Sequence, residues 1–497
     1  MKESQDESNA GLRSRSIAAL GWSAIDVAGR QGIQFAVTLV LVRLLSPAEF
    51  GLIGMLTLFI ALASSIVDSG FGSALIQRKD ITEEDKSSVF YFNAAVGAVM
   101  ALALFFAASW IAGFYRQPIL LSMTRWMSLN LFIDSFGVVQ VALLTRTLNF
   151  QTQCKVSILA IVVSGATAVL MARQGYGVWS LVAQTLVYTA VSTALLWVVC
   201  PWKPALLFRV QSLRSLYGFG SRMLVSGLLN TFFDRIQLTV IGKAFSAREL
   251  GYYTRAFSTQ QFPVALISFV VSRVTFPVFS QASHDIDLLR RGVRKSLVSL
   301  MVLTFPMMIG LAVVAKPFVL VLFGPKWLPC VQYLRVLSIA GALWPVHIIN
   351  LNVTMAMGRS DLFLRLEILK KILIGLGIVC TFRISVLAMV WAMLIVGMLC
   401  VIINTHYTKP LIGYGLFSQL HDLAPYAGVS VLMAAVAWAV STFLPGPPAV
   451  QLILSVLTSV IFYCGVCYVL RLEAYRSVLA SVGAEFSRRR GVSAVTF

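Results

Sequence analysis

Six arginines lie inside long apolar stretches of this sequence, where charged side chains are rare. They are Arg30, Arg125, Arg222, Arg235, Arg255 and Arg335. The planar guanidinium group can donate two parallel hydrogen bonds to a phosphate or a carboxylate, so these residues favour binding of an anionic group. An arginine at the centre of a membrane helix costs about 2.5–3.5 kcal/mol even on the lower insertion scale. We therefore expect most of the six to face a protein interior or a water-filled cavity.

A structural role explains some of these arginines more easily than others. Arg30 lies four residues after Asp26, so the two side chains share a helix face and can pair with each other. Arg125 could reach the outer interface or a neighbouring helix. Arg222 and Arg335 have no acidic residue three or four positions away, which makes them the first candidates for contact with a ligand.

Carboxylates in the same stretches are the second set of candidate functional groups. They are Asp26, Asp68, Asp134, Asp234 and, near a helix end, Glu367. The excess of arginine over carboxylate predicts a cavity of positive potential, suited to a pyrophosphate or an acidic sugar. Exchange of a proton or a sodium ion would need a titratable acid, for which Asp26 and Asp234 rank before Asp68 and Asp134. A fixed salt bridge with a neighbouring arginine is the alternative for each of them.

The composition indicates the environment in which these charges lie. Of the 497 residues, 58% are hydrophobic and 12% are charged, against about 25% charged in a typical soluble domain. Apolar runs of roughly 18 or more residues, each able to cross a bilayer core of about 30 Å, recur along the whole chain. The sequence therefore predicts an all-α polytopic membrane protein. The alternating ten-residue segments of a membrane β-barrel are absent.

The net charge of +20 is better explained by membrane topology than by nucleic-acid binding. The expected spans are 16–43, 47–71, 87–113, 118–142, 151–172, 175–200, 214–242, 247–272, 296–322, 327–357, 362–382, 384–404, 424–444 and 448–470. With both termini in the cytoplasm, most of the 40 Lys and Arg residues fall on the inner side. The first span reads as an uncleaved membrane helix.

The four histidines are too dispersed for a metal site, and no P-loop or cofactor motif occurs.

Two six-residue stretches, SPAEFG at 46–51 and SARELG at 246–251, repeat the pattern Ser-x-x-Glu-apolar-Gly. In each, the Ser side chain can accept from the backbone of the first turn while the Glu reaches back, which is a capping box. The preceding spans also match, since each carries a polar stripe at four-residue spacing. The stripes are Trp22, Asp26, Arg30 and Gln34 in the first copy and Arg222, Ser226, Asn230 and Asp234 in the second. The sequence thus predicts two parallel six-helix repeats, and parallel repeats of this kind enclose a substrate site near the membrane midplane. We expect lobes at 1–213 and 214–405, two further helices at 406–470 and a basic cytoplasmic tail at 471–497.

Several segments resemble bacterial Wzx-type polysaccharide flippases, in particular the branch that includes the colanic acid exporter. They are LVRLLSPAEFGLIGMLTLF, DSGFGSALIQRKDIT, ELGYYTRAFS, VTFPVFS and VLFGPKW, and the likeness extends from about residue 16 to 405. This resemblance implies the fold of the multidrug/oligosaccharidyl-lipid/polysaccharide (MOP) exporter superfamily, with two six-helix bundles in a V shape plus two C-terminal helices. It also implies translocation of undecaprenyl-pyrophosphate-linked repeat units across the bacterial inner membrane, with a polymerase and a chain-length regulator as pathway partners.

Two other functions remain open from the sequence. The nearer is a drug or cation antiporter of the same superfamily, against which the arginine excess argues. The other is a membrane polysaccharide polymerase or ligase. Such enzymes need an outer catalytic loop, whereas the outside connections predicted here are short and carry no carboxylate pair.

Overall fold

The computed structural model describes residues 29–68, 70–78, 80–270, 275–444, 446–477 and 480 of the chain. Asp26 and the first part of the first expected span lie outside the described residues. Everything described is helix or short connection, with no strand among these residues. The expected all-α class is therefore confirmed.

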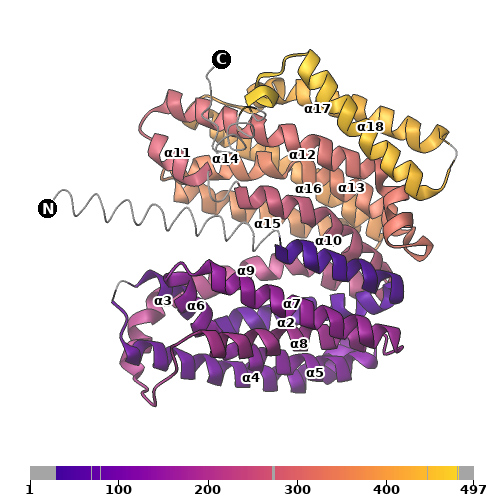
Figure 1. The fold of residues 1–497 in the computed structure, drawn as a ribbon. Helices are drawn as coiled ribbons and strands as arrows, with labels where there is room; N and C mark the ends of the chain where they lie inside the picture. Colours follow the sequence, from indigo (N-terminus) through magenta and orange to yellow (C-terminus); the bar gives the residue numbers. More distant parts are fainter. Residues whose placement is uncertain are drawn as a thin grey trace, which may run out of the picture. The chain divides into compact units, whose positions relative to one another are not determined.

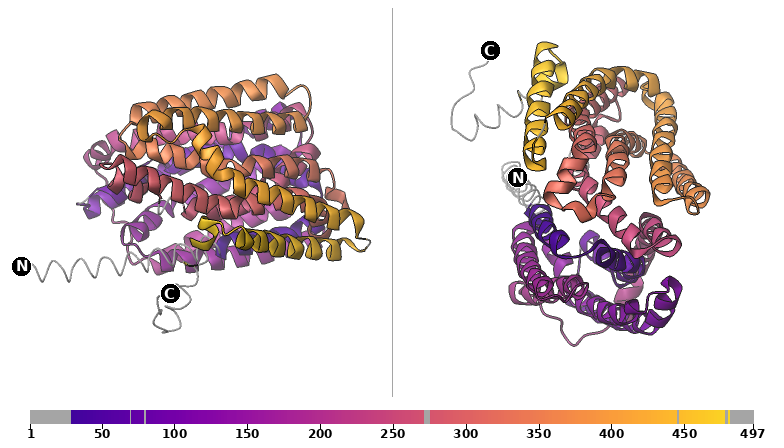
Figure 2. Two further views of the ribbon diagram at one scale, coloured as in Figure 1. Left: turned by 90° about the horizontal axis from the view of Figure 1, so that it is seen from above. Right: turned by 90° about the vertical axis from the view of Figure 1, so that its right-hand side faces the viewer.

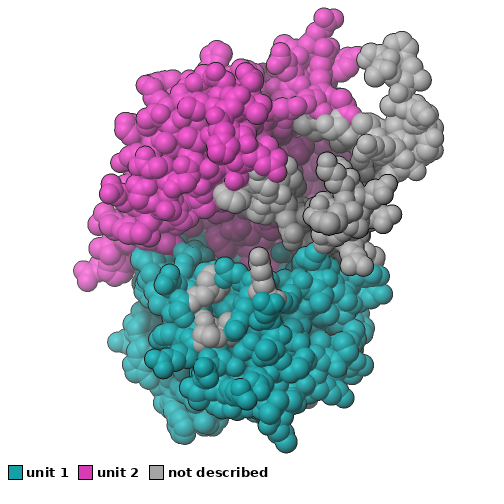
Figure 3. Space-filling view, turned by 90° about the vertical axis from the view of Figure 1, so that its left-hand side faces the viewer, with its two compact units in different colours: residues 1–254 teal, residues 255–497 magenta. Residues whose placement is uncertain are grey.

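The chain forms two compact units, residues 1–254 and 255–497 (Figure 3). The first contains a helix over residues 29–44 followed by α2 (Pro47–Asp68), α3 (Phe71–Gln77), α4 (Glu83–Tyr115), α5 (Ile119–Ser135), α6 (Val138–Arg146), α7 (Phe150–Arg173), α8 (Trp179–Val199), α9 (Val210–Ala244) and the first part of α10 (Ala247–Val270). The second continues through α11 (Phe276–Ala282), α12 (Ile286–Leu322), the 3₁₀ turn η2 (Pro325–Trp327), α13 (Cys330–Ala342), α14 (Trp344–Ala356), α15 (Ser360–Thr381), α16 (Val386–Ile412), α17 (Leu416–Phe443) and α18 (Pro448–Val469).

Long helices packed side by side make up each unit (Figures 1 and 2). In unit 1, α4 packs on α5, α7 on α8, and α9 on α2, α3 and α4. Because α9 is held this way, the contact boundary falls within α10, after Thr254, rather than near residue 213. In unit 2, α12 packs on α13, α17 and α18, and α15 on α16. Figure 2 shows α17 and α18 lying together as a C-terminal pair.

The order of elements repeats along the chain. A seven-residue helix precedes a long one in both halves: α3 before α4, which has 33 residues, and α11 before α12, which has 37. The helices α2 and α10 begin at Pro47 and Ala247, just after the two Ser residues of the repeated hexapeptides. This correspondence is what an internal duplication of a helical bundle would leave.

Nine of the described helices are long and apolar enough to cross a membrane, or ten if the bent pair α5–α6 counts as one span. That pair bends by 41° where Phe136 and Gly137 interrupt the helix. The remaining expected spans coincide with α9, α10, α15 and the helix over 29–44. Polar residues interrupt α9, α10 and α15, and the helix over 29–44 is described only in part. The chain is a multi-pass membrane protein, and the count of fourteen spans stays a prediction.

Candidate functional site

A polar pocket of about 440 Å³ lies within unit 1, between the helix over 29–44 and helices α7 and α8. Its lining residues are Arg30, Gln31, Gln34, Ile161, Ser164, Gln184, Thr185 and Tyr188. Amides, hydroxyls and one guanidinium thus share a site inside a bundle of otherwise apolar helices. Such a set can both donate to and accept from a polar ligand, as sugar hydroxyls require. Gln184 even keeps a buried Nε2 atom with no hydrogen-bond partner among the described residues.

The pocket depends on how α7 approaches the first helix. Gly165 lies so close to Val37 that a Cβ added to Gly165 would be 3.1 Å from one of its methyl carbons and nearer still to the other. This contact sets Ser164, the residue before Gly165 on α7, at the pocket wall. Sequence analysis found Arg30 and noted Gln34 on the polar stripe, but it missed Gln184, Thr185 and Tyr188. Their only signal was the presence of polar residues inside an apolar span.

The polar stripe predicted on α9 is present and faces away from the packed core of unit 1. Arg222, Ser226, Asn230 and Asp234 recur every fourth residue, and all four side chains are exposed. The opposite side of α9 packs on α2, where the hydroxyls of Ser65 and Thr231 are 3.1 Å apart. The stripe is therefore an open row of polar groups on a helix that is otherwise largely apolar.

Most of the predicted arginines are not neutralised by a carboxylate. Among the described residues, no carboxylate oxygen lies within 4.0 Å of the guanidinium groups of Arg125, Arg222, Arg235 or Arg335. Arg335 is exposed on α13 in unit 2, whereas Arg255, on the part of α10 that belongs to unit 2, is only half-buried and lies beside Cys330. Within unit 1 the predicted arginines occupy different places: Arg30 lines the polar pocket, Arg222 lies on the α9 stripe, and Arg125 lines a separate groove.

The aspartates are also distributed over different places. Asp234 lies on the exposed α9 stripe. Asp68 ends α2 and Asp134 lies at the end of α5, and their carboxylates are close enough to repel each other. In the described ranges, no group of three or more metal-ligating side chains occurs. The structure thus brings Asp68 and Asp134 together, which sequence spacing had not indicated.

The two repeated hexapeptides contact each other directly within unit 1. At the first, the Glu49 carboxylate accepts from the Ser46 backbone N–H at 2.6 Å and from its hydroxyl at 2.8 Å, and Ser46 Oγ accepts from the Glu49 N–H. At the second, Ser246 Oγ accepts from the Glu249 N–H at 3.2 Å. The predicted capping box is confirmed in full at Ser46, and at Ser246 the half formed by the Ser side chain is confirmed.

The glycine that ends each hexapeptide allows the two helix starts to approach. A Cβ on Gly51 would overlap the Ala247 carbonyl group, 2.5 Å from its carbon, and a Cβ on Gly251 would lie 2.6 Å from the Pro47 carbonyl carbon. Each glycine therefore accommodates the backbone at the start of the other helix. This reciprocal contact crosses α2 and α10 at their N-terminal ends.

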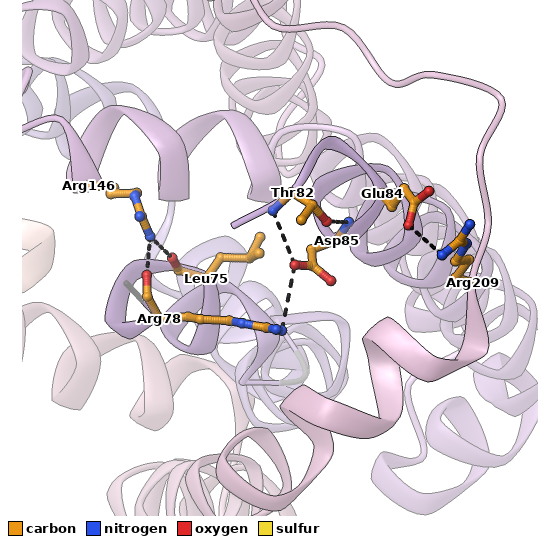
Figure 4. Close-up of polar contacts among 7 residues, drawn as sticks. All are labelled: Leu75, Arg78, Thr82, Glu84, Asp85, Arg146 and Arg209. Atoms are coloured by element: carbon orange, nitrogen blue, oxygen red, sulfur yellow. Dashed lines mark hydrogen bonds and ion pairs between the residues drawn. The ribbon is translucent and has the colours of Figure 1, made fainter. Parts of the chain in front are cut away.

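At the N-terminus of α4, charged residues hold the connection between α8 and α9 against the rest of unit 1 (Figure 4). Thr82 and Asp85 form a capping box at the α4 N-terminus, and Arg78 lies 3.6 Å from Asp85. The Arg146 guanidinium, from α6, donates to the carbonyl oxygens of Leu75 and Arg78. Arg209, just before α9, pairs with Glu84 of α4 at 3.1 Å.

Unit 2 contains a buried polar cluster that the sequence did not predict. His347 Nδ1 lies 2.7 Å from the Asn404 amide nitrogen, and Lys370 Nζ lies 3.4 Å from His347 Nε2. Lys370 also pairs with Glu367 at 3.0 Å, one turn away on α15. The spacing of Glu367 and Lys370 was the available signal, but nothing in the sequence connected them to His347.

Comparison with solved structures identifies the class. A lipid II flippase, MurJ, in an inward closed conformation, matches with a TM-score of 0.71 at 14% identity, over 92% of this chain and 99% of that one. An inward-facing multidrug resistance MATE family transporter of the MOP superfamily matches with a TM-score of 0.63 at 16% identity, over 77% and 94%. At such identities the likeness shows the fold, which is that of the MOP transporters.

Comparison of sequences adds the family. Residues 40–332 match the family described as polysaccharide biosynthesis protein, and the chain belongs to that family. It is 29% identical over 383 residues to the teichuronic acid biosynthesis protein TuaB of Bacillus subtilis, covering 76% of this chain and 79% of that one. It is 32% identical over 327 residues to the succinoglycan biosynthesis transport protein ExoT of Rhizobium meliloti, covering 66% of each.

A third relative, the lipopolysaccharide biosynthesis protein WzxC of Escherichia coli, is 26% identical over 364 residues, covering 73% of this chain and 74% of that one. The resemblance to Wzx-type proteins is confirmed. The family and the fold together define a membrane transporter of polysaccharide biosynthesis.

Proposed function

We propose that the protein moves undecaprenyl-pyrophosphate-linked oligosaccharide repeat units from the inner to the outer leaflet of a bacterial inner membrane. The product would serve synthesis of an exopolysaccharide, a capsule or an O-antigen. The observation that carries this proposal is the lack of a carboxylate partner at Arg222 and at Arg335 among the described residues. The relatives, which include a succinoglycan biosynthesis transport protein, support the same substrate class.

The physical problem for such a substrate is its headgroup. Sugar hydroxyls that enter hydrocarbon lose their hydrogen bonds to water, at roughly 2–7 kcal/mol for each group left unpaired. A lining such as that of the Arg30 pocket, with Gln184 and Tyr188, replaces those bonds. The arginines bind the pyrophosphate bidentately, while the polyprenyl chain stays in the lipid.

Alternating access requires a contact on one side of the membrane that opens and closes. The reciprocal contact of Gly51 and Gly251 at the starts of α2 and α10 is our candidate for this gate. With both termini in the cytoplasm, as the distribution of Lys and Arg favours, this contact lies on the outer side. Coupling to a proton or sodium gradient would use Asp26 or Asp234 on the two polar stripes, with Asp68 and Asp134 as the next candidates.

Proteoliposomes containing the full-length protein and an undecaprenyl-pyrophosphate-linked fluorescent oligosaccharide test the proposal. A membrane-impermeant quencher measures how fast the label changes leaflets. A hydrogen bond to a charged group contributes about 1.5–3 kcal/mol, so Arg222→Ala and Arg335→Ala should each weaken substrate binding about tenfold or more. Arg383→Ala, an exposed arginine in the connection between α15 and α16, is the matched control.

Two results would contradict the proposal. One is wild-type movement of the lipid-linked sugar in the double variant Arg222→Ala, Arg335→Ala. The other is transport of a cationic dye, but not of the oligosaccharide lipid, by the wild-type protein. The second result would favour the antiporter function instead.

A further inference from the structure

A second hollow of unit 1, the α4–α5 groove, lies apart from the polar pocket. It has a volume of about 700 Å³, and its walls include Ala98, Ala101 and Phe105 from α4 and Arg125, Leu129 and Phe132 from α5. This volume falls within the range of about 300–1,000 Å³ that is usual for small-molecule sites. Ala98 and Ala101 have small side chains, which leaves the groove deep at their positions. The groove is therefore a depression between two adjacent helices, not a gap in the core.

The walls of the groove belong to an apolar exposed surface of unit 1. Leu102 is 58% exposed and Trp126 is 55% exposed, and Phe106, one residue after the wall residue Phe105, is 75% exposed. In a multi-pass membrane protein an exposed apolar helix face of this kind meets acyl chains. We conclude that the α4–α5 groove opens to lipid.

One charged group interrupts this apolar surface. The Arg125 side chain is exposed, and its Cζ lies 4.8 Å from the centre of the Phe105 ring. No carboxylate oxygen of the described chain comes within 4.0 Å of it. A cation–π contact offsets only part of the desolvation of a guanidinium, because it leaves the five N–H donors without acceptors. An anion bound at this place would accept hydrogen bonds from those donors.

The position of Arg125 along the helices indicates where that anion comes from. Near the α4–α5 connection, Trp110 is exposed and stacked on Phe114, and an exposed tryptophan at a helix end is typical of a membrane–water interface. Phe105 precedes the exposed Trp110 by five positions, or about 7.5 Å along the helix, so the guanidinium beside Phe105 lies within about one side-chain length of this interface. Ser122 and Arg125 line the part of the groove nearer this end, and Leu129 and Phe132 line the deeper part.

We propose that the α4–α5 groove binds one anionic phospholipid. Its phosphate accepts hydrogen bonds from the Arg125 guanidinium, and one acyl chain lies over Leu129 and Phe132. The polarity of the groove matches the polarity of a phospholipid, with the charge toward the headgroup region and the apolar walls below it. This site is separate from substrate transport, so its failure would leave the proposed function unaffected.

Trp126 lines the groove and provides a direct reporter. We would reconstitute the full-length protein in phosphatidylcholine that contains increasing fractions of brominated-chain phosphatidylglycerol or of brominated-chain phosphatidylcholine. Subtracting the emission of Trp126→Phe isolates the Trp126 signal. A basic residue contributes about 1 kcal/mol near an anionic lipid surface, so half-maximal quenching should need about fivefold less of the anionic lipid.

The variants decide whether Arg125 carries the preference. Arg125→Gln and Arg125→Ala should make the two quenching curves coincide, and Arg125→Lys should retain part of the difference between them. The control is Arg173→Ala, which removes an exposed arginine at the end of α7 and should leave the difference unchanged. Thermal unfolding identifies any variant that fails to fold, and in that case Arg125→Gln or Arg125→Lys decides.

Several outcomes would overturn the proposal. These are equal quenching by the two lipids in the wild type, an unchanged preference in Arg125→Gln, and emission from Trp126 that neither lipid quenches, which would mean that protein covers the groove. Relief of quenching by undecaprenyl phosphate, but not by unbrominated phosphatidylglycerol, would also do so, because it would assign the groove to a polyprenyl phosphate.

Discussion

Replacing one glycine at the contact of α2 and α10 should separate the two helix starts. In Gly51→Ala, the new methyl group would be 2.5 Å from the Ala247 carbonyl carbon, so the backbone of one helix must move. Overpacking costs about 1–3 kcal/mol, and alanine recovers about 0.5–1 kcal/mol through its helix propensity. Because the methyl group would meet backbone and not the end of a flexible side chain, the upper part of the overpacking range applies. The net loss is then about 1–2.5 kcal/mol, which weakens the contact by a factor of about 5–70. Gly251→Ala should behave in the same way.

Distances between two spin labels measure this effect. Labels at Leu44→Cys and Arg248→Cys, both exposed, would flank the contact in a background without the seven native cysteines. We expect one short distance in the parent protein and a second, longer population in Gly51→Ala. Gly227→Ala is the matched control, since it lies within α9 and the position that its new methyl group would take has no neighbouring atom of the described chain within 4 Å.

The double variant gives a sharper check. Gly51→Ala and Gly251→Ala break the same contact, so their effects should be far from additive. If Gly51→Ala retained the parent distance distribution, or if Gly227→Ala shifted it as much, the close contact would not be what holds the helix starts together.

Two further predictions concern stability and use unfolding of the purified protein in mixed detergent micelles. Thr82→Ala removes the hydroxyl that accepts from the Asp85 N–H, and it should cost about 0.5–2 kcal/mol, whereas Thr458→Ala, whose hydroxyl bonds only within its own helix, should cost less. Equal losses would contradict a capping role. Asn350 and Gln419 exchange two buried amide hydrogen bonds of 3.0 and 2.9 Å. Asn350→Leu should therefore cost about 1–3 kcal/mol, and the double change with Gln419→Leu should recover much of it; a double variant no more stable than Asn350→Leu would refute this pairing.

The sequence predicted those features that depend on local pattern. Apolar runs located the helices, and the Ser and Glu of each repeated hexapeptide located two helix starts, because a cap involves residues only three positions apart. The four-residue spacing of Arg222, Ser226, Asn230 and Asp234 likewise fixed one exposed helix face, because the period of a helix is known in advance.

Features formed by distant segments could not be predicted in this way. The pocket joins Arg30 to Gln184 through three helices, and the polar cluster of unit 2 joins His347 to Asn404 and Lys370. Sequence spacing cannot reveal either group of residues, because each group depends on which helices pack together. The lack of a carboxylate within 4.0 Å of Arg222 and of Arg335, among the described residues, also depends on packing. The sequence could exclude an acidic partner one turn away on the same helix, but it could not exclude a partner on another helix.

The repeated hexapeptide shows how local and tertiary requirements combine. Two helices that meet at their N-terminal ends bring together two positive dipole ends, which repel each other. A carboxylate in each first turn, Glu49 and Glu249, opposes that repulsion, and Ser46 and Ser246 satisfy backbone donors that the meeting would otherwise bury. The glycine of each hexapeptide then allows contact at backbone distance. Each hexapeptide packs against the other, so a substitution in one of them disrupts the same contact as a substitution in the other. This reciprocity explains why Ser, Glu and Gly occur at the same positions in both hexapeptides.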